Sequence, residues 1–380
     1  MQKNVRCLKH GSADVYFHSL LPGYFVYHCN IMKTIFKFLL TLIIVIVTLL
    51  AGLLVWLSVT EFKPAAVEAV AVESRGEAVE TGKELSLFCW NIGYSGLGAA
   101  QDFFMDGGKN VRPESKDIVY GYLDGITQTI KEADADIILL QEVDQNSRRS
   151  YHVNQRELLS GYYSSNSYAL NYSCPFVPIP FPPMGQVNSG LLTLTDGLAI
   201  SSAQRIALTC PFSWPVRIAN LKRCLLVSYI PVKGSDKMLV LVNLHLEAYT
   251  DSEGREAQTK QFLDLITAEY EKGNYVIAGG DFNQFFPGSR IVYPKVSTDW
   301  DAQELDPSRL PAGWTMAYDL SVPTCRALNQ PYNPSNPTTQ YFSIDGLILS
   351  PNVKMLEVKT IDKGFENSDH NPVQLRFVLN

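Results

Sequence analysis

Short apolar runs recur along most of the chain, and their length is typical of buried strands. Strands are expected at residues 85–90, 137–141, 224–230, 238–246, 275–279, 343–349, 353–361 and 373–379, with two more within 190–208. Apolar residues at helical spacing predict helices over 117–132 and around 254–271. Strands dominate, and several links resemble hairpins. This pattern favours two packed sheets flanked by helices over a purely parallel sheet.

One apolar segment is much longer than any strand. Residues 38–59 carry no charge and would span roughly 33 Å as a helix, enough to cross a bilayer core. We expect a single-pass membrane anchor; a cleaved signal peptide is the alternative. Lys33 and Lys37 precede the segment, whereas Glu61 and Lys63 follow it, so the positive-inside rule places the C-terminal bulk outside the cytoplasm.

The segments around this apolar run predict the domain organisation. Residues 1–31 show neither helical nor strand periodicity, and we expect the natural start at Met32, with the anchor at 32–60. Residues 61–84, rich in Ala, Glu and Val, are expected to form a tether to a domain over 85–380. Residues 163–186 are aromatic and proline-rich, which favours a surface loop; the alternative is a rim that touches substrate or bilayer.

Charge and cysteine content narrow the functional classes. From Glu84 onward the chain has 24 Lys and Arg against 32 Asp and Glu, a net charge of −8. Nucleic-acid-binding surfaces are usually basic, so this acidity counts against tight nucleic-acid binding. The seven cysteines show no metal-type spacing, and their pairing cannot be assigned from sequence.

Polar residues stand at the ends of several predicted strands. Each has a structural explanation when taken alone, such as a turn cap or a satisfied buried histidine. If the strands are aligned, however, the set converges on one rim of the sheets, where sites are commonly built. Such carboxylates and amides suit Mg²⁺, or else Mn²⁺ or Ca²⁺, and a hard cation with histidines suits hydrolysis of a phosphate ester. The set is Asn91, Glu142, His245, Asp281, Asn283, Asp345, Asp369 and His370.

The segments that carry these residues resemble the endonuclease/exonuclease/phosphatase superfamily in order and approximate spacing. They read "CWNIG", "LLQEVD", "VNLHLEAY", "GGDFNQ", "SIDGLILSP" and "NSDHNPV". The resemblance covers roughly residues 85–380 and implies a four-layer α/β sandwich. It also implies a divalent-metal-dependent phosphoester hydrolase.

The resemblance implies a role for each matched residue. Glu142 resembles the principal metal ligand, Asn91 the residue that orients the metal site, and Asp369 a residue beside the metal. Asp281 and Asn283 resemble the pair that positions the attacking water and the phosphate. His370 is similar to the base or phosphate-binding histidine, with Asp345 fixing its tautomer, and His245 to the residue that assists the leaving group.

Some positions depart from the family pattern or lie beside it. Gly346 stands where many members carry an aromatic residue or arginine. Asp106 lies in a long connection after Asn91, where it forms a tight turn or else approaches substrate. Arg148, Arg149 and Tyr151 follow Glu142 and are either solvated or in contact with a phosphate or leaving group.

The substrate stays open at this stage. A lipid phosphodiesterase or inositol-phosphate phosphatase fits the expected anchor, a nuclease fits the breadth of the superfamily, and a catalytically silent surface-binding protein is the alternative from another class. We expect a phosphate-ester substrate and membrane association through residues 38–59, and no obligate protein partner is evident.

Overall fold

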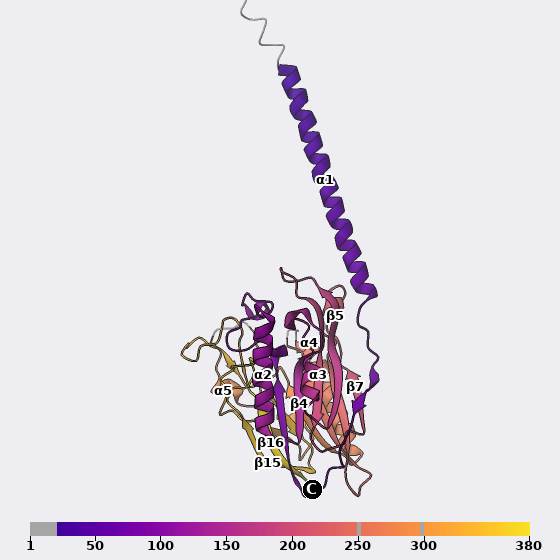
Figure 1. The fold of residues 1–380 in the computed structure, drawn as a ribbon, viewed down its shortest axis with the longest axis vertical. Coiled ribbons are helices and arrows are strands. Elements are labelled where there is room, and N and C mark those ends of the chain that lie inside the picture. The colour runs from indigo at the N-terminus through magenta and orange to yellow at the C-terminus, as the bar shows by residue number, and fades with distance from the viewer. Residues whose placement is uncertain (1–20, 249–251, 297–299) are drawn as a thin grey trace, which may run out of the picture. The chain divides into compact units, whose positions relative to one another are not determined.

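The computed structural model describes residues 21–248, 252–296 and 300–380, and the chain divides into two compact units between Val59 and Thr60. The N-terminal unit contains helix α1 (Leu21–Val59), drawn in indigo in Figure 1. Residues 1–20 of the predicted leader lie outside the described residues. The last eleven residues of the leader, 21–31, are part of α1. Within Tyr27–Val59 of α1, an 18-residue window has a mean hydropathy of 3.1, as expected of a membrane span or a signal sequence.

The second unit, Thr60–Asn380, contains two mixed seven-stranded sheets. Sheet 1 has the order β1 (Val67–Val70), β7 (Ser202–Ala207), β8 (Cys224–Pro231), β9 (Met238–His245), β10 (Tyr275–Asp281), β14 (Asp345–Leu349) and β11 (Thr315–Ala317). Sheet 2 has the order β15 (Val353–Thr360), β16 (Val373–Leu379), β3 (Glu84–Asn91), β4 (Ile137–Asp144), β6 (Gly185–Thr195), β5 (Ser165–Val177) and β2 (Val72–Glu73). The pairs β9–β10 and β3–β4 are parallel, and the other pairs within these sheets are antiparallel.

The remaining elements are short or lie outside the sheets. The helices are α2 (Lys116–Ala133), α3 (Gln155–Ser160), α4 (Ser252–Glu271) and α5 (Ser289–Val292). The 3₁₀ turns are η1 (Gly93–Ser95), η2 (Phe104–Asp106), η3 (Arg148–Ser150), η4 (Val216–Ala219) and η5 (Pro307–Arg309), and β12 (Cys325–Arg326) pairs with β13 (Tyr341–Phe342).

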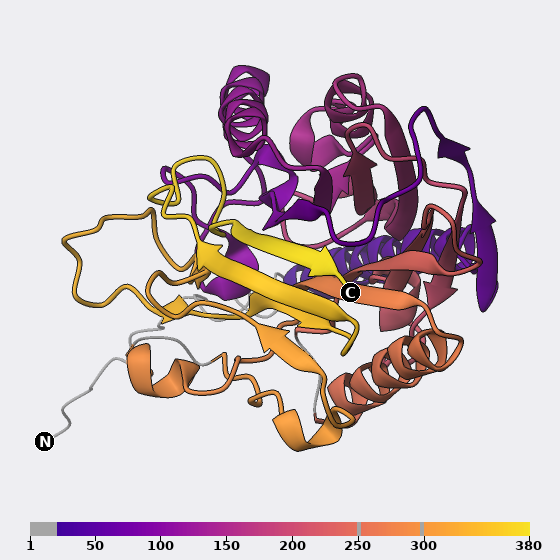
Figure 2. The same ribbon diagram turned by 90° about the horizontal axis from the view of Figure 1, so that it is seen from below.

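Alternation along β3 explains how the layers form. Leu87 lies in the apolar core between the sheets, whereas its neighbour Phe88 packs outward in the core beneath α2. A strand with both faces covered reads as a continuous apolar run, which is the pattern seen in the sequence. On the other side, α4 places Phe262 against the outer face of sheet 1. Figure 2 shows α2 and α4 on opposite outer faces, so the predicted four-layer sandwich is confirmed.

Two expectations about irregular segments are wrong. Residues 163–186 are mostly strand: β5 and the start of β6 form one long hairpin, whose tip is 178–184. The predicted tether, 61–84, contains β1 and β2, which add edge strands to the two sheets through the pairs Val67–Ile206 and Val72–Ser167. Cross-strand pairing to distant residues satisfies the backbone in both segments, and local periodicity does not reveal such pairing.

Candidate active site

Three predicted site residues of sheet 1 lie side by side because of strand register. The parallel strands β9 and β10 both end at the same edge of the sheet, which pairs His245 with Asp281. Strand β14 runs antiparallel and begins there, so Asp345 lies directly opposite Asp281. His245 Nε2 is 3.5 Å from Asp281 Oδ2. His245, Asp281 and Asp345, separated by 36 and 64 positions in the chain, thus lie at the same end of sheet 1.

Asn91 connects this edge to sheet 2. It is the last residue of β3, and its Nδ2 atom donates to Asp281 Oδ2 at 3.1 Å and to Glu142 Oε1 at 3.3 Å. The register of β4 shifts between Leu140 and Val143, and Glu142 takes a positive φ of 54° in this bulge. Bulges redirect side chains. The result is a carboxylate that is 23% exposed beside otherwise buried partners.

His370 approaches the same place from the segment before β16. Its Nδ1 atom lies 2.8 Å from Asp345 Oδ2, while Nε2 lies 3.8 Å from Asp281 Oδ2 and 3.9 Å from Asp369 Oδ2. An accepting carboxylate at Nδ1 keeps the proton there and leaves Nε2 facing the cluster. The geometry expected for Asp345 as the residue that orients His370 is therefore present.

The four buried ionisable groups differ in their proton affinity. Burial and then the Asp345 carboxylate raise the pKa of Asp281 to about 7, and burial and then Glu142 raise that of Asp369 to about 6. Burial lowers the pKa of His245 well below its ordinary value, with Arg223 adding to the effect. Burial acts the same way on His370, but Asp345 and its other neighbours outweigh it and raise the pKa well above the ordinary value. The site thus combines a neutral and a charged imidazole.

Two buried polar atoms at the site have no hydrogen-bond partner among the described residues: His245 Nδ1 and Asp345 Oδ1. Asn283, by contrast, is well held, because its backbone nitrogen donates to Asp281 Oδ1 at 2.9 Å and its Nδ2 donates to the Leu246 carbonyl at 2.8 Å. Unpaired buried polar atoms are costly in a folded core and are frequent where a ligand or ion binds.

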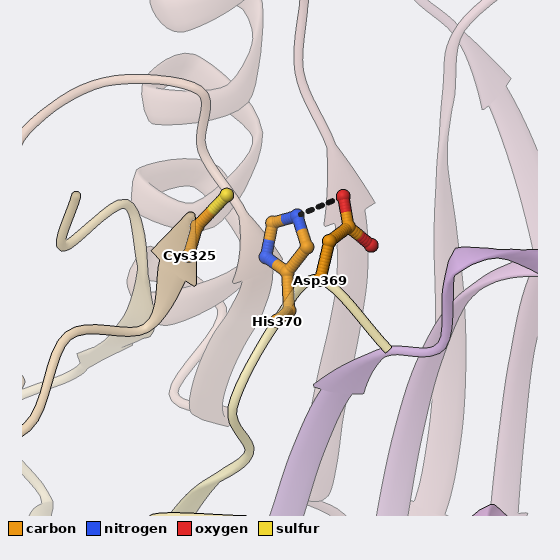
Figure 3. A group of neighbouring side chains, drawn as sticks. All are labelled: Cys325, Asp369 and His370. Atoms are coloured by element: carbon orange, nitrogen blue, oxygen red, sulfur yellow. Dashed lines mark ion pairs between the residues drawn. The ribbon is translucent and has the colours of Figure 1, made fainter. Parts of the chain in front are cut away.

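The donor set suits a divalent cation. The ligand atoms of Asp281, Asp345 and His370 lie within 4.8 Å of one another, and Cys325, Asp369 and His370 form a second such group. Figure 3 shows the His370 ring between Cys325 and Asp369. Sequence reasoning missed Cys325, because no ligand-type spacing marks it; an isolated bridge between Cys325 and His370 brings it here. The oxygen donors nearby fit the expectation of Mg²⁺.

Arg149 and Tyr151, expected to meet substrate or solvent, contact the protein itself. Arg149 is buried and donates from Nε and Nη2 to Asp144 at 3.2 and 3.0 Å, with Nη2 3.8 Å from Glu142 Oε2. Its guanidinium also lies over the Tyr94 ring at 3.7 Å. The Tyr151 hydroxyl donates to the Pro113 carbonyl at 2.8 Å. Arg149 therefore holds the bulge that presents Glu142.

Asp106 lies in a tight turn, and Gly346 lies where there is no space for a side chain. Asp106 ends η2, and the following Gly107 has φ 90°, so the predicted tight turn is present. Asp106 Oδ2 accepts from the Leu328 nitrogen at 3.4 Å, and its charge contributes to the raised pKa of Asp369. At Gly346, an added Cβ would meet the Phe286 ring at 2.5 Å, which explains why this position lacks a side chain.

Comparisons with known proteins agree with this geometry. A model of the endonuclease/exonuclease/phosphatase family matches residues 90–370. No curated protein sequence matches significantly.

Solved structures share the fold. A Beutenbergia cavernae endonuclease/exonuclease/phosphatase is 16% identical, with 78% of this chain and 72% of that chain covered and a TM-score of 0.53. A Bacteroides vulgatus endonuclease/exonuclease/phosphatase is 15% identical, with 78% and 100% covered and a TM-score of 0.50. ANGEL2, described as a 2′,3′-cyclic phosphatase, is 14% identical, with 82% and 98% covered and a TM-score of 0.50. Since the family model spans most of its length, this chain belongs to the endonuclease/exonuclease/phosphatase family.

Proposed function

We propose that this protein is a divalent-metal-dependent phosphoester hydrolase, anchored in a membrane by α1 with its catalytic domain outside the cytoplasm. The observation that carries the enzymatic part is the convergence of strand ends from both sheets. Asn91 Nδ2 lies within hydrogen-bonding distance of Glu142 and of Asp281, and His370 adjoins the same carboxylate. A purely structural core has no need for several carboxylates and two histidines at one edge.

The residues present fit a hard cation. Glu142, with Asn91 and Asp369 beside it, would hold Mg²⁺, and Mn²⁺ or Ca²⁺ would suit the same oxygen donors. Burial and neighbouring carboxylates raise the pKa of Asp281 and of Asp369 although His370 lowers both, so the charge of His370 does not balance the acids of the cluster. When bound, the metal supplies Lewis-acid stabilisation of the charge on the phosphoryl oxygens.

The other side chains of the site would each have a separate catalytic role. Asp281, whose pKa is raised to about 7, is suited to accept a proton from the attacking water, and Asn283 is held beside it by the Asn283 backbone nitrogen. His370 carries positive charge through its contact with Asp345 and would bind a phosphoryl oxygen. Burial keeps His245 neutral, so it can donate a hydrogen bond to the leaving oxygen.

The acidity of the chain narrows the classes of substrate that suit it. From Glu84 onward its net charge is −8, which disfavours binding of a polyanionic duplex, because such binding needs a basic surface. A small or lipid-linked phosphoester fits better. A nuclease is the second candidate because of the breadth of the family, and ANGEL2, whose fold this chain shares, is described as a 2′,3′-cyclic phosphatase. The contacts of Asp281 with Asn91, His245 and His370 count against the catalytically silent alternative.

The test is turnover of a substrate panel by the full chain in detergent. Plasmid DNA, RNA with 2′,3′-cyclic ends, sphingomyelin, phosphatidylinositol and inositol polyphosphates would be assayed with Mg²⁺, Mn²⁺, Ca²⁺ and EDTA. Glu142→Gln should lower metal-dependent turnover by about 10³-fold or more, because it removes a charged ligand. Glu114→Gln, at an exposed carboxylate, is the matched control and should not change turnover. Undiminished activity of Glu142→Gln would reject the site.

A further inference from the structure

The β5–β6 hairpin projects from the end of the sandwich that carries the site. Strand β4 runs toward Glu142 and ends at Asp144, which pairs with Ser189 of β6. Residues of β6 before Ser189 therefore continue past the end of β4, and Gly185 lies four residues further, roughly 14 Å. The hairpin tip, 178–184, lies beyond that point, and Figure 1 shows β5 extending past β4.

The tip is apolar and open to solvent. Ile179 is 69% exposed and Phe181 is 96% exposed. Residues 158–195, which include both strands of the hairpin, carry no Asp, Glu, Lys or Arg. Soluble surfaces rarely cluster such side chains without a partner. The tip is therefore a candidate for contact with an apolar phase.

A second apolar loop lies at the same end. The segment 208–223 connects β7 to β8, and β8 begins beside the end of β9, where Leu225 pairs with Leu244, the neighbour of His245. Trp214 is 54% exposed and Val216 is 57% exposed on this loop.

The loop packs alongside the hairpin. The Tyr172 hydroxyl of β5 donates to the Ala219 carbonyl at 2.9 Å, and the Lys222 nitrogen donates to the Asn171 carbonyl at 2.7 Å. We call Ile179, Phe181, Trp214 and Val216 together the apolar rim.

The chain itself restricts how far this loop lies from a membrane. Arg217 Nε lies 2.9 Å from Glu61 Oε1, and Lys222 Nζ lies 3.2 Å from the same atom. Glu61 follows the last residue of α1, Val59, by two positions. Two residues reach at most about 7 Å, whatever angle the helix takes. If α1 spans a bilayer, the loop beside Glu61 therefore lies close to its surface.

We propose that the apolar rim rests in the outer surface of the bilayer that α1 enters and turns the active site toward lipid phosphoesters. This proposal rests on the proposed function and names its substrate class. Aromatic and aliphatic side chains at a membrane surface leave water without losing hydrogen bonds, and tryptophan is favoured at that depth. The Arg217 guanidinium next to Val216 is paired with Glu61, so the contact with lipid rests on the apolar side chains.

Docking is tested directly by fluorescence of the full chain reconstituted in phosphatidylcholine–phosphatidylserine vesicles. Lipid brominated in its acyl chains quenches tryptophan that reaches the bilayer. Wild-type protein should lose more emission than Trp214→Phe, and the difference reports Trp214 alone because the other tryptophans are common to both. Equal quenching of the two proteins would overturn the proposal.

Activity gives the second measurement. The double variant Ile179→Ser, Phe181→Ser should lower turnover of the vesicle lipid hydrolysed by wild type about tenfold or more, since two large side chains lose their burial in lipid. Turnover of a water-soluble phosphodiester should not change. Tyr162→Ser is the matched control: it removes an aromatic side chain that is 57% exposed, near the opposite end of β5. It should leave both activities unchanged.

The outcomes separate the two proposals. Equal loss of lipid and soluble turnover in the double variant, or an equal loss in Tyr162→Ser, would refute a docking role for the hairpin. A complete lack of phosphoester turnover by wild type would refute the proposed function, and Trp214 quenching would then decide docking alone. If lipid turnover instead requires an added protein and lipid does not quench Trp214, the apolar rim contacts that protein and not the bilayer.

Discussion

Replacing Asp281 by Asn changes activity and stability in opposite directions. Asp281 is buried, and its Oδ2 atom faces Asn91 Nδ2 and both histidines of the site. Asn has the same shape but no charge. We expect hydrolysis to fall by about 10²-fold or more, because the variant lacks an acceptor for the proton of water. The metal-free protein should nevertheless become more stable at pH 8.

The magnitude follows from the pKa. Burial and then Asp345 raise the pKa of Asp281 from 3.8 to about 7, and each tenfold change in proton affinity is worth about 1.4 kcal/mol. Ionised Asp281 therefore costs the folded state about 4 kcal/mol above pH 7. Since Asn283 fixes Oδ1, Asn at this position turns its amide nitrogen toward Asn91, which costs about 1–2 kcal/mol. A net gain of about 2–3 kcal/mol remains.

The sign depends on pH. Because folding raises the pKa of Asp281, its carboxyl group costs the folded state no stability below pH 3.8. The cost grows as pH rises from 3.8 through about 7. At pH 4 the advantage of Asp281→Asn should therefore disappear. The assay is thermal unfolding in EDTA at both pH values, where a net gain of 2–3 kcal/mol corresponds to about 5 °C.

Asp264→Asn is the control for this experiment. Its side chain is 62% exposed on α4, and the substitution should give the same small change in stability at both pH values. Adding Mg²⁺ should raise the melting temperature of the wild type more than that of Asp281→Asn, since binding to the folded state stabilises it. A variant that is less stable than wild type at pH 8, or equally shifted at pH 4 and pH 8, would contradict the electrostatic account of this site.

Three further substitutions test positioning and packing. Asp345→Asn should lower kcat by about 10²–10³-fold with little change in KM, because the contact that orients His370 is weakened. It should also move the alkaline limb of the pH–rate profile to lower pH, since Asp345 raises the pKa of His370; an unmoved limb would count against this. Gly346→Ala should destabilise the domain by about 1–3 kcal/mol through its clash with Phe286, measured by thermal unfolding. Gly121→Ala in α2, where an added Cβ meets nothing within 4 Å, should instead stabilise it by about 0.5–1 kcal/mol.

The regular elements were largely predictable because local pattern reflects burial. The run at 137–141 lies within β4, and Ser115 caps α2 by accepting from the Ile118 nitrogen. Expectations were wrong at 61–84 and 163–186, where β1, β2 and β5 obtain their hydrogen bonds from distant strands. Composition indicated a linker and a loop there, but pairing at a sheet edge overrode it.

The site was predictable in membership more than in arrangement. Polar residues at strand ends were visible in the sequence, and the structure has Asp281 in contact with Asn91, His245 and His370. Cys325 was missed because only the segment preceding β14 brings it beside His370. Arg149 was expected to meet either solvent or substrate, but its bidentate contact with Asp144 makes it part of the support for Glu142.

The sequence by itself determined the alternation of strand and helix, the long apolar N-terminal segment and the acidic character of the domain, since each is a local or summed property. Tertiary structure decided which strand ends meet, because register sets Asp345 opposite Asp281 and the β4 bulge turns Glu142 toward Asn91. It also placed the apolar hairpin tip at the end that carries the site. Such facts depend on hydrogen bonds between segments far apart in the chain, and no local pattern encodes them.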